Sequence, residues 1–158
     1  MVTFGTDFVF RCGTRELVRA LSDAGIAAYL YDFNHHFRGY IPPDSLACQL
    51  DSELLCGVYH SSEIKFIFQD PLLAHLPSKV DLQVSAAMGL LWTNMAKYGS
   101  PNGAADVPRS TDAPYWPQYR TASDMHLEIS GGFSAQSGLA KPSCDVWSSL
   151  PPQTSYPH

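Results

Sequence analysis

The sequence of 158 residues has no apolar run approaching the roughly 20 residues that a helix needs to span a bilayer, so we predict no membrane span. Basic residues are also few: 10 lysines and arginines stand against 15 aspartates and glutamates, for a formal net charge of −5. This balance argues against nucleic acid or an anionic membrane surface as a partner. No basic segment precedes the first apolar residues, and Asp7 and Arg11 interrupt them, so we expect no signal peptide in this chain.

Clusters of metal ligands are also lacking. His35 and His36 are adjacent, but no further ligands have a spacing that suits zinc, and a solvated pair is the simpler interpretation. No motif surrounds the other histidines outside the segment discussed below, which are His75, His126 and His158. We therefore predict no cofactor and no metal site.

The chain has four cysteines, an even number that permits two disulfides. Cys48 and Cys56 flank a short acidic segment and could close that segment as a local pair. The alternative is four reduced thiols in a cytosolic chain. The residues by themselves leave both possibilities open.

The hydrophobic pattern of the first third predicts a helix followed by a strand. Apolar residues within 17–21 recur at helical spacing after Thr14, which is suited to be an N-cap, and Gly25 is placed to end the helix. An aromatic-rich run of strand length follows over Ala27–Phe33. A helix, a glycine and then a buried strand form the repeating unit of an α/β sheet.

A long helix is predicted over 78–97. Ser78 and Asp81 form a weaker relative of the capping box, with Asp in the place of Glu, and Gly99 stops the helix. An apolar stripe at spacings of three and four predicts a core-facing surface made by Val84, Met88, Leu91, Trp92 and Met95.

The last third is predicted to be mostly irregular. Residues 99–120 are rich in Pro, Gly, Asp and Ser and indicate a surface loop around an aromatic anchor, Trp116. A second strand is predicted over His126–Ser130, followed by a turn at Gly131 and Gly132. The proline-containing end of the chain, from Pro142 onward, is typical of a frayed tail.

Only two convincing strands are therefore predicted. Two strands do not make an independently stable sheet, and the strand over Ala27–Phe33 would present open edges lined with aromatic side chains. We find no internal repeat and no domain boundary. The expected fold class is α/β, in one domain that is incomplete on its own.

A histidine, His60, stands at the end of a long loop over 35–56 that shows no periodicity. A loop of that length inside a compact domain is usually functional. A short helix is predicted directly after the histidine, capped by Ser61 or Ser62, with Glu63 at the positive end of its dipole. The apolar face expected to anchor this helix comprises Ile64, Ile67 and Phe68. A histidine on such a rigid element suits a general base.

Four stretches carry a resemblance to a known family. They are Gly57-Val58-Tyr59-His60-Ser61-Ser62-Glu63-Ile64, Ala28-Tyr29-Leu30-Tyr31-Asp32-Phe33-Asn34-His35, Trp92-Thr93-Asn94-Met95-Ala96-Lys97-Tyr98-Gly99-Ser100-Pro101-Asn102 and Tyr115-Trp116-Pro117-Gln118-Tyr119. In their order and spacing they resemble the C-terminal part of the type-B carboxylesterase/cholinesterase family of α/β-hydrolases, and the first resembles its catalytic-histidine segment. The resemblance runs from about Asp7 to about Trp147, and the family's enzymes are several times longer.

This resemblance implies a disulfide and a substrate class. Cys12 and Cys144 stand where the family places the two ends of a long-range disulfide. Ser62 replaces a tyrosine that cholinesterases use in an aromatic cage for quaternary ammonium, which favours uncharged esters over choline esters. Family members are often secreted, but no feature of this chain assigns a location.

The resemblance also implies ester hydrolysis by a serine, a histidine and an acid, with His60 as the base. The serine of the family lies on a Gly-x-Ser-x-Gly elbow. The stretch Gly132-Phe133-Ser134-Ala135-Gln136 lacks the second glycine and follows the histidine instead of preceding it. Glu63 is better explained as a first-turn helix residue than as the acid.

The sequence thus predicts the C-terminal part of an α/β-hydrolase fold over 1–147, with a flexible tail over 148–158. This part contributes the catalytic histidine, His60, to a hydrolase of small-molecule carboxylic esters, and it is expected to be inactive without the serine and the acid. The alternatives are a non-catalytic interaction or adhesion module of the cholinesterase-like fold and a truncated relic.

Overall fold

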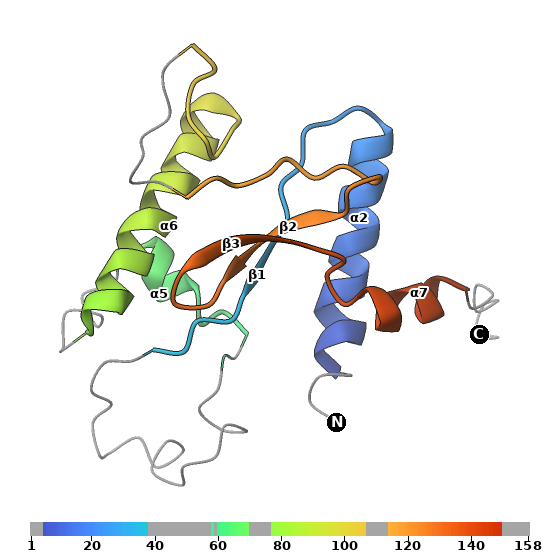
Figure 1. Ribbon diagram of the computed structural model, residues 1–158, viewed down its shortest axis with the longest axis horizontal. Coiled ribbons are helices and arrows are strands. Elements are labelled where there is room, and N and C mark those ends of the chain that lie inside the picture. Colours follow the sequence, from blue (N-terminus) through green and yellow to red (C-terminus); the bar gives the residue numbers. More distant parts are fainter. Residues whose placement is uncertain (1–4, 38–57, 59, 70–76, 107–113, 150–158) are drawn as a thin grey trace, which may run out of the picture.

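The computed structural model describes residues 5–37, 58, 60–69, 77–106 and 114–149. A mixed sheet of three strands lies between two groups of helices (Figure 1). The strands are β1 (Tyr31–Phe33), β2 (Met125–Ile129) and β3 (Phe133–Ser137), in that spatial order. The first two are parallel and the last two antiparallel. The α/β class that the sequence predicts is confirmed.

The helical elements are η1 (Asp7–Arg11), α2 (Cys12–Asp23), α5 (Ile64–Ile67), α6 (Lys79–Tyr98) and α7 (Lys141–Ser149). None of the helices in the described ranges combines the length and the apolarity that crossing a bilayer requires.

The alternation of side chains along the sheet decides which helices cover each face. Tyr31 pairs with Leu127 and Phe33 with Ile129, and these apolar side chains pack with α5 and α6 in the main core cluster. Asp32 lies on the opposite face, where it meets Arg11 of η1. The sheet is therefore covered by α5 and α6 on one side and by η1 and α2 on the other (Figure 1).

The long helix α6 agrees closely with the sequence. The Ser78 side chain accepts a hydrogen bond from the Asp81 N–H, and the Asp81 carboxylate accepts one from the Ser78 N–H, which completes the capping box. Gly99 ends the helix in the left-handed conformation with φ of 67°. In the predicted stripe, Val84, Met88 and Leu91 are buried and Trp92 packs against the same core. Met95 is an exception, because 40% of its surface is exposed.

The N-terminal helix begins earlier than predicted. Thr14 is not an N-cap, because helical structure already runs through Asp7–Arg11 as a π-turn that continues directly into α2. Gly25 follows the end of α2 with φ of 75°, as the sequence predicts. Of the apolar residues predicted to share a face of this helix, Val18 is buried, whereas Leu17 is exposed.

Strand β1 covers only the last three residues of the run predicted as a strand. The earlier part is bound to a loop instead, since the Ala28 carbonyl accepts from the Tyr119 N–H at 2.8 Å. The Leu30 carbonyl accepts from the Trp116 indole N–H at 2.9 Å. Trp116 is 5% exposed, so the predicted aromatic anchor is confirmed, and the Asn102 side chain holds its backbone by a reciprocal pair of hydrogen bonds.

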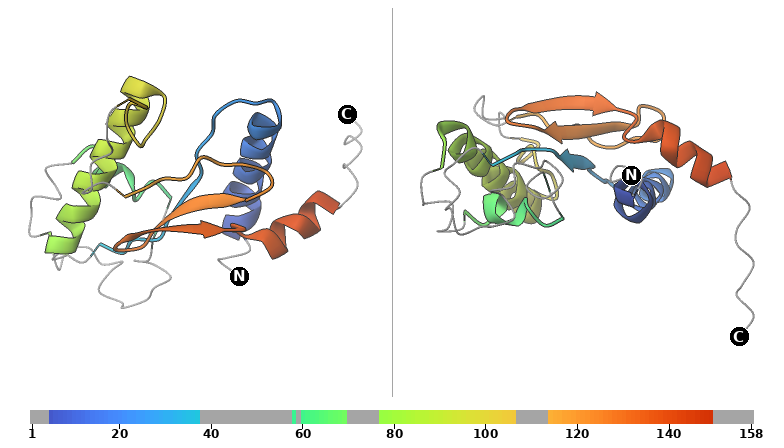
Figure 2. Two further views of the ribbon diagram at one scale, coloured as in Figure 1. Left: turned by 45° about the horizontal axis from the view of Figure 1, so that its top comes forward. Right: turned by 90° about the horizontal axis from the view of Figure 1, so that it is seen from below.

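Two elements of the C-terminal third contradict the sequence prediction. β3 is a third strand, formed after the predicted turn at Gly131 and Gly132, and its polar residues are mostly exposed because it lies at the sheet edge. α7 replaces the frayed tail expected from Pro142 onward, since a proline is tolerated in the first turn of a helix. Figure 2 shows α7 following β3 and beginning beside α2. Residues 150–158, which carry most of the predicted tail, lie outside the described residues.

Candidate functional site

His60 is an exposed residue of the turn that immediately precedes α5. Its ring stacks on the ring of Phe10 from η1, with centroids 4.6 Å apart and an interplanar angle of 18°. Within the described ranges, neither ring nitrogen hydrogen-bonds to another residue, Glu63 included. Among the described residues, the imidazole is therefore contacted through one face by Phe10, and none of them occupies its two nitrogens.

The start of α5 differs from its predicted form. Neither Ser61 nor Ser62 caps the helix with its side chain, and Glu63 occupies the N-cap position without a side-chain hydrogen bond. Instead, Ser61 adopts a positive φ of 71°, and its carbonyl accepts from the Ile64 N–H at 3.2 Å. Ser62 is 5% exposed, and its hydroxyl has no hydrogen-bond partner in the part of the chain that the structure describes.

Phe66 anchors α5. Of the apolar face predicted for this helix, Ile67 does pack against the main core, but Ile64 and Phe68 do not belong to it. Phe66 is 1% exposed, whereas Ile64 and Phe68 are 47% and 77% exposed. The reason is a tertiary contact: the Ser85 hydroxyl of α6 donates to the Phe66 carbonyl at 2.8 Å, which fixes the direction of the turn. Because the helix is a single turn, its own periodicity does not determine which side chain faces the core.

His35 is a buried residue, and the expectation of a solvated pair is wrong for it. His35 is 2% exposed, while its neighbour His36 is exposed. The His35 Nε2 atom lies 2.7 Å from the Asp81 Oδ1 atom, and both side chains are fully enclosed. The other carboxylate oxygen accepts from the Ser78 N–H at 2.8 Å and from its hydroxyl at 2.7 Å. Asp81 therefore caps α6 and binds the segment after β1 at the same time.

His35 also supports the turn that carries His60. The rings of His35 and Phe66 meet edge to face with centroids 5.1 Å apart. The segment after β1, the start of α6 and α5 are therefore packed together directly behind the His60 turn. Across the described ranges, no group of three His, Cys, Asp or Glu residues is placed to hold a metal ion.

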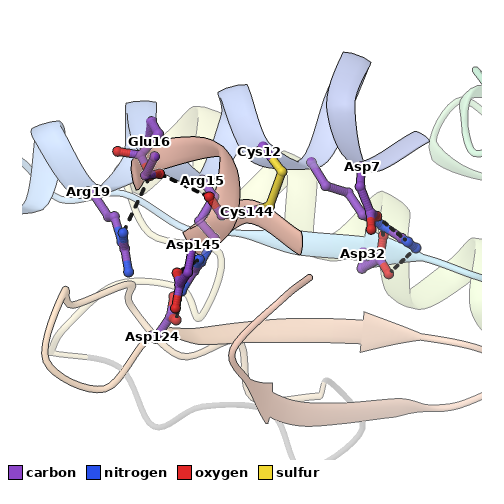
Figure 3. The surroundings of a disulfide bond; sticks show 11 residues. Asp7, Cys12, Arg15, Glu16, Arg19, Asp32, Asp124, Cys144 and Asp145 are labelled. Carbon is purple, nitrogen blue, oxygen red and sulfur yellow. Dashed lines mark hydrogen bonds and ion pairs between the residues drawn. A yellow bond between two sulfur atoms is a disulfide. The ribbon is translucent and has the colours of Figure 1, made fainter. Parts of the chain in front are cut away.

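The predicted long-range disulfide is present. Cys12 at the start of α2 and Cys144 in α7 are bonded, with Cα atoms 5.1 Å apart, and both are buried (Figure 3). Cys48 and Cys56, the predicted local pair, lie outside the described residues.

A buried ion-pair cluster lies next to the disulfide (Figure 3). The Arg15 side chain has no solvent exposure; it donates through two nitrogens to Asp124 and through a third to Asp145 at 2.9 Å. Burial acts to lower the pKa of Arg15, but the hydrogen bonds and charges of the two carboxylates outweigh it and raise the pKa above its ordinary value. A hydrogen bond from Lys141, followed by that from Arg15, lowers the pKa of Asp145 to about 2. Through these side chains the cluster joins α2 and α7 to Asp124, the residue before β2, and we interpret it as structural.

Replacing Arg15 by methionine is expected to lower the free energy of unfolding by about 3 kcal/mol, measured by urea denaturation. Removing one partner of a buried ion pair typically costs about 3–5 kcal/mol, and we take the lower end because Asp145 is 42% exposed. As a matched control, Arg120→Met removes an exposed arginine whose side chain binds only the partly buried Gln118 in the described region, and it should change stability by less than about 1 kcal/mol. Equal losses in both variants would contradict the expected cost of the buried pair.

None of the described residues supplies the triad serine or the triad acid at His60. Ser134 lies inside β3, where it accepts a hydrogen bond from Gln136 at 3.2 Å, and not on a turn between a strand and a helix. Glu63, as noted, makes no hydrogen bond to His60. A histidine without these partners cannot activate a hydroxyl, since activation needs a serine within about 2.6–3.2 Å.

Comparison with known proteins gives consistent matches. The family model described as "Carboxylesterase family" matches residues 1–147. The chain is 30% identical over 147 residues to "Fatty acyl-CoA hydrolase precursor, medium chain" of Anas platyrhynchos, covering 93% of this chain and 24% of that protein. It is 28% identical over 142 residues to "Carboxylesterase 1C" of Mus musculus, covering 87% and 23%. With "Carboxylesterase 4A" of Bos taurus it is 30% identical over 119 residues, covering 75% and 19%. The chain therefore spans about a quarter of the length of these relatives or less.

Proposed function

The chain belongs to the carboxylesterase family, and from this premise we propose that it supplies the catalytic histidine, His60, of a serine carboxylic-ester hydrolase. Its helices and three-stranded mixed sheet are consistent with part of the α/β-hydrolase fold of that family. The observation that best supports the proposal is the state of the His60 ring, which is exposed and has no hydrogen-bond partner at either nitrogen within the described ranges.

The free nitrogens matter because a triad histidine uses both of them. One nitrogen takes the proton of the serine hydroxyl as that oxygen attacks the ester carbonyl, and later gives the proton to the leaving alcohol. The other nitrogen donates to the acid, which orients the ring and stabilises the imidazolium. In the proposed enzyme, His60 fills this role and the serine and the acid come from residues that this chain does not contain.

The proposed substrate is a small, uncharged carboxylic ester. This class follows the two relatives named carboxylesterases. The relative named a fatty acyl-CoA hydrolase shares the acyl-transfer chemistry, although an acyl-CoA is neither small nor uncharged. Ser62 supports the same substrate class, because it offers no aromatic ring to a quaternary ammonium group.

The chain alone is expected to be unreactive toward a fluorophosphonate probe, which labels activated serines. No serine of the described residues lies on an exposed elbow beside His60, so none of these hydroxyls is placed for activation. The purified chain would be incubated with the probe and analysed by mass spectrometry. Labelling of any serine that disappears in His60→Ala would contradict this expectation, because it would reveal a complete site within the chain.

The decisive second experiment applies the same probe to a form of the protein that also carries the family's serine and acid. There the probe should label one serine, and His60→Ala should abolish the labelling. If that form is not labelled either, the proposal of an esterase fails, and a non-catalytic module of the same fold becomes the better explanation.

A further inference from the structure

The contact between Phe10 and His60 joins two segments that are far apart in the sequence. The two rings are nearly parallel, with a 4.6 Å separation of centroids and an 18° angle between planes. Phe10 comes from η1, on the far side of the sheet from α6, while His60 leads into α5. The stack therefore connects the two helical layers of the fold.

A stack is a contact that a catalytic imidazole can accept without losing function. The two nitrogens of the ring lie on its edge, and both are needed for proton transfer and orientation. A hydrogen bond to either nitrogen would compete with those partners. Contact with the face of the ring restricts its rotation and leaves both nitrogens free.

The position of Phe10 is itself fixed by the adjacent residue. Arg11 donates from two nitrogens to the Asp32 carboxylate of β1, at 3.2 and 2.8 Å, and from a third to Asp7 at 3.2 Å. The next residue, Cys12, forms the disulfide with Cys144 of α7. The π-turn thus attaches Phe10 to the sheet, and π-turns of this kind frequently occur at functional sites.

We propose that Phe10 is a positioning residue, which orients the His60 imidazole by stacking on its face. The proposal rests on the proposed function, since it gives His60 a ring orientation to maintain for catalysis. Phe10 touches neither substrate nor reacting atoms and acts through the histidine.

The chain offers a matched control for this residue. Phe8 lies in the same π-turn and has similar exposure, 57% against 43% for Phe10. Its ring packs on Trp147 of α7, with centroids 4.8 Å apart, and is not stacked on His60. Phe8→Leu and Phe10→Leu therefore remove the same atoms from the same element, and only the second removes the stack.

The first test is the NMR spectrum of the histidine ring protons in the full 158-residue chain, with His60 assigned by comparison with His60→Gln. The ring current of Phe10 should shift the His60 protons upfield of those of the exposed His36. In Phe10→Leu they should move to the position of an exposed histidine, and in Phe8→Leu they should stay in place. Unchanged His60 protons in Phe10→Leu would overturn the proposal.

The second test measures turnover of a neutral ester in the form of the protein that carries the serine and the acid. Phe10→Leu should lower kcat by up to about 100-fold with KM nearly unchanged, because a misoriented base slows proton transfer without affecting binding. Phe10→Tyr keeps the ring and should restore most of the loss, and Phe8→Leu should retain kcat. Wild-type kcat in Phe10→Leu would refute the positioning role alone, whereas unchanged activity in His60→Ala would refute the proposed function.

Discussion

His60→Ala is expected to lower kcat by about 10⁶-fold in a form of the protein that carries the serine and the acid, which is the loss seen when a triad histidine is removed from a serine hydrolase. The loss is this large because the three groups act as a unit: without a base, the serine hydroxyl is a weak nucleophile at neutral pH. KM should change little, since His60 contributes to proton transfer more than to substrate binding. Hydrolysis of a short-chain p-nitrophenyl ester would measure both constants.

His36→Ala is the appropriate control for this experiment. His36 is exposed and has no described contact with the His60 turn, so its removal should leave kcat within about twofold. His35→Ala is not a neutral control, because it would remove the hydrogen bond between His35 and the buried Asp81 carboxylate and would weaken the packing behind α5. A comparable loss of kcat in His36→Ala would mean that His60 is not the specific base.

Removing the disulfide by Cys12→Ala together with Cys144→Ala is expected to lower the free energy of unfolding by about 5 kcal/mol. The bond joins residues separated by 132 positions, and in the chain-entropy model closing a loop of that length restricts the unfolded state by about this amount. Since a domain is typically stable by about 5–15 kcal/mol, the loss would remove between a third and all of the folding free energy. Urea denaturation monitored by tryptophan fluorescence would measure the change.

Chemical reduction supplies the control for the disulfide variant. If the bond is the cause, the wild-type chain in the presence of a reductant should unfold at the same urea concentration as the double variant. The reductant should have no further effect on the double variant unless another disulfide contributes. A double variant as stable as the oxidised wild type would show that the crosslink does not stabilise the fold.

The elements that the sequence predicts well are those whose signals are local. The capping box at Ser78 and Asp81, the stop at Gly99 and the strand β2 each depend on residues within one or two turns of one another. Gly25 belongs to the same group, because a glycine at the end of a helix needs only its own backbone to adopt a positive φ.

Predictions failed where a distant residue decides the outcome. His35 is buried because Asp81, which lies 46 positions away, accepts its hydrogen bond, and nothing in the adjacent sequence indicates that partner. Phe66 faces the core because Ser85 binds its carbonyl. β3 was missed because its residues are polar, as an exposed edge strand allows.

The candidate site depends on one residue that the sequence predicts and one contact that it does not. The family resemblance predicts His60 as the base, and the family model supports the family, while the role of His60 stays a prediction. The contact with Phe10 carries no sequence signal, since the two residues are 50 positions apart and only the fold brings their rings together.

The disulfide has one more consequence, which concerns the covalent topology of the chain. The bond between Cys12 and Cys144 closes a ring that contains β1, His60, α5, α6 and the β2–β3 hairpin. A single cut of the backbone anywhere inside a ring opens it without releasing a piece. A protein nicked once between these cysteines would therefore remain one molecule under oxidising conditions, with His60 still tethered to the strand and the helices that support it.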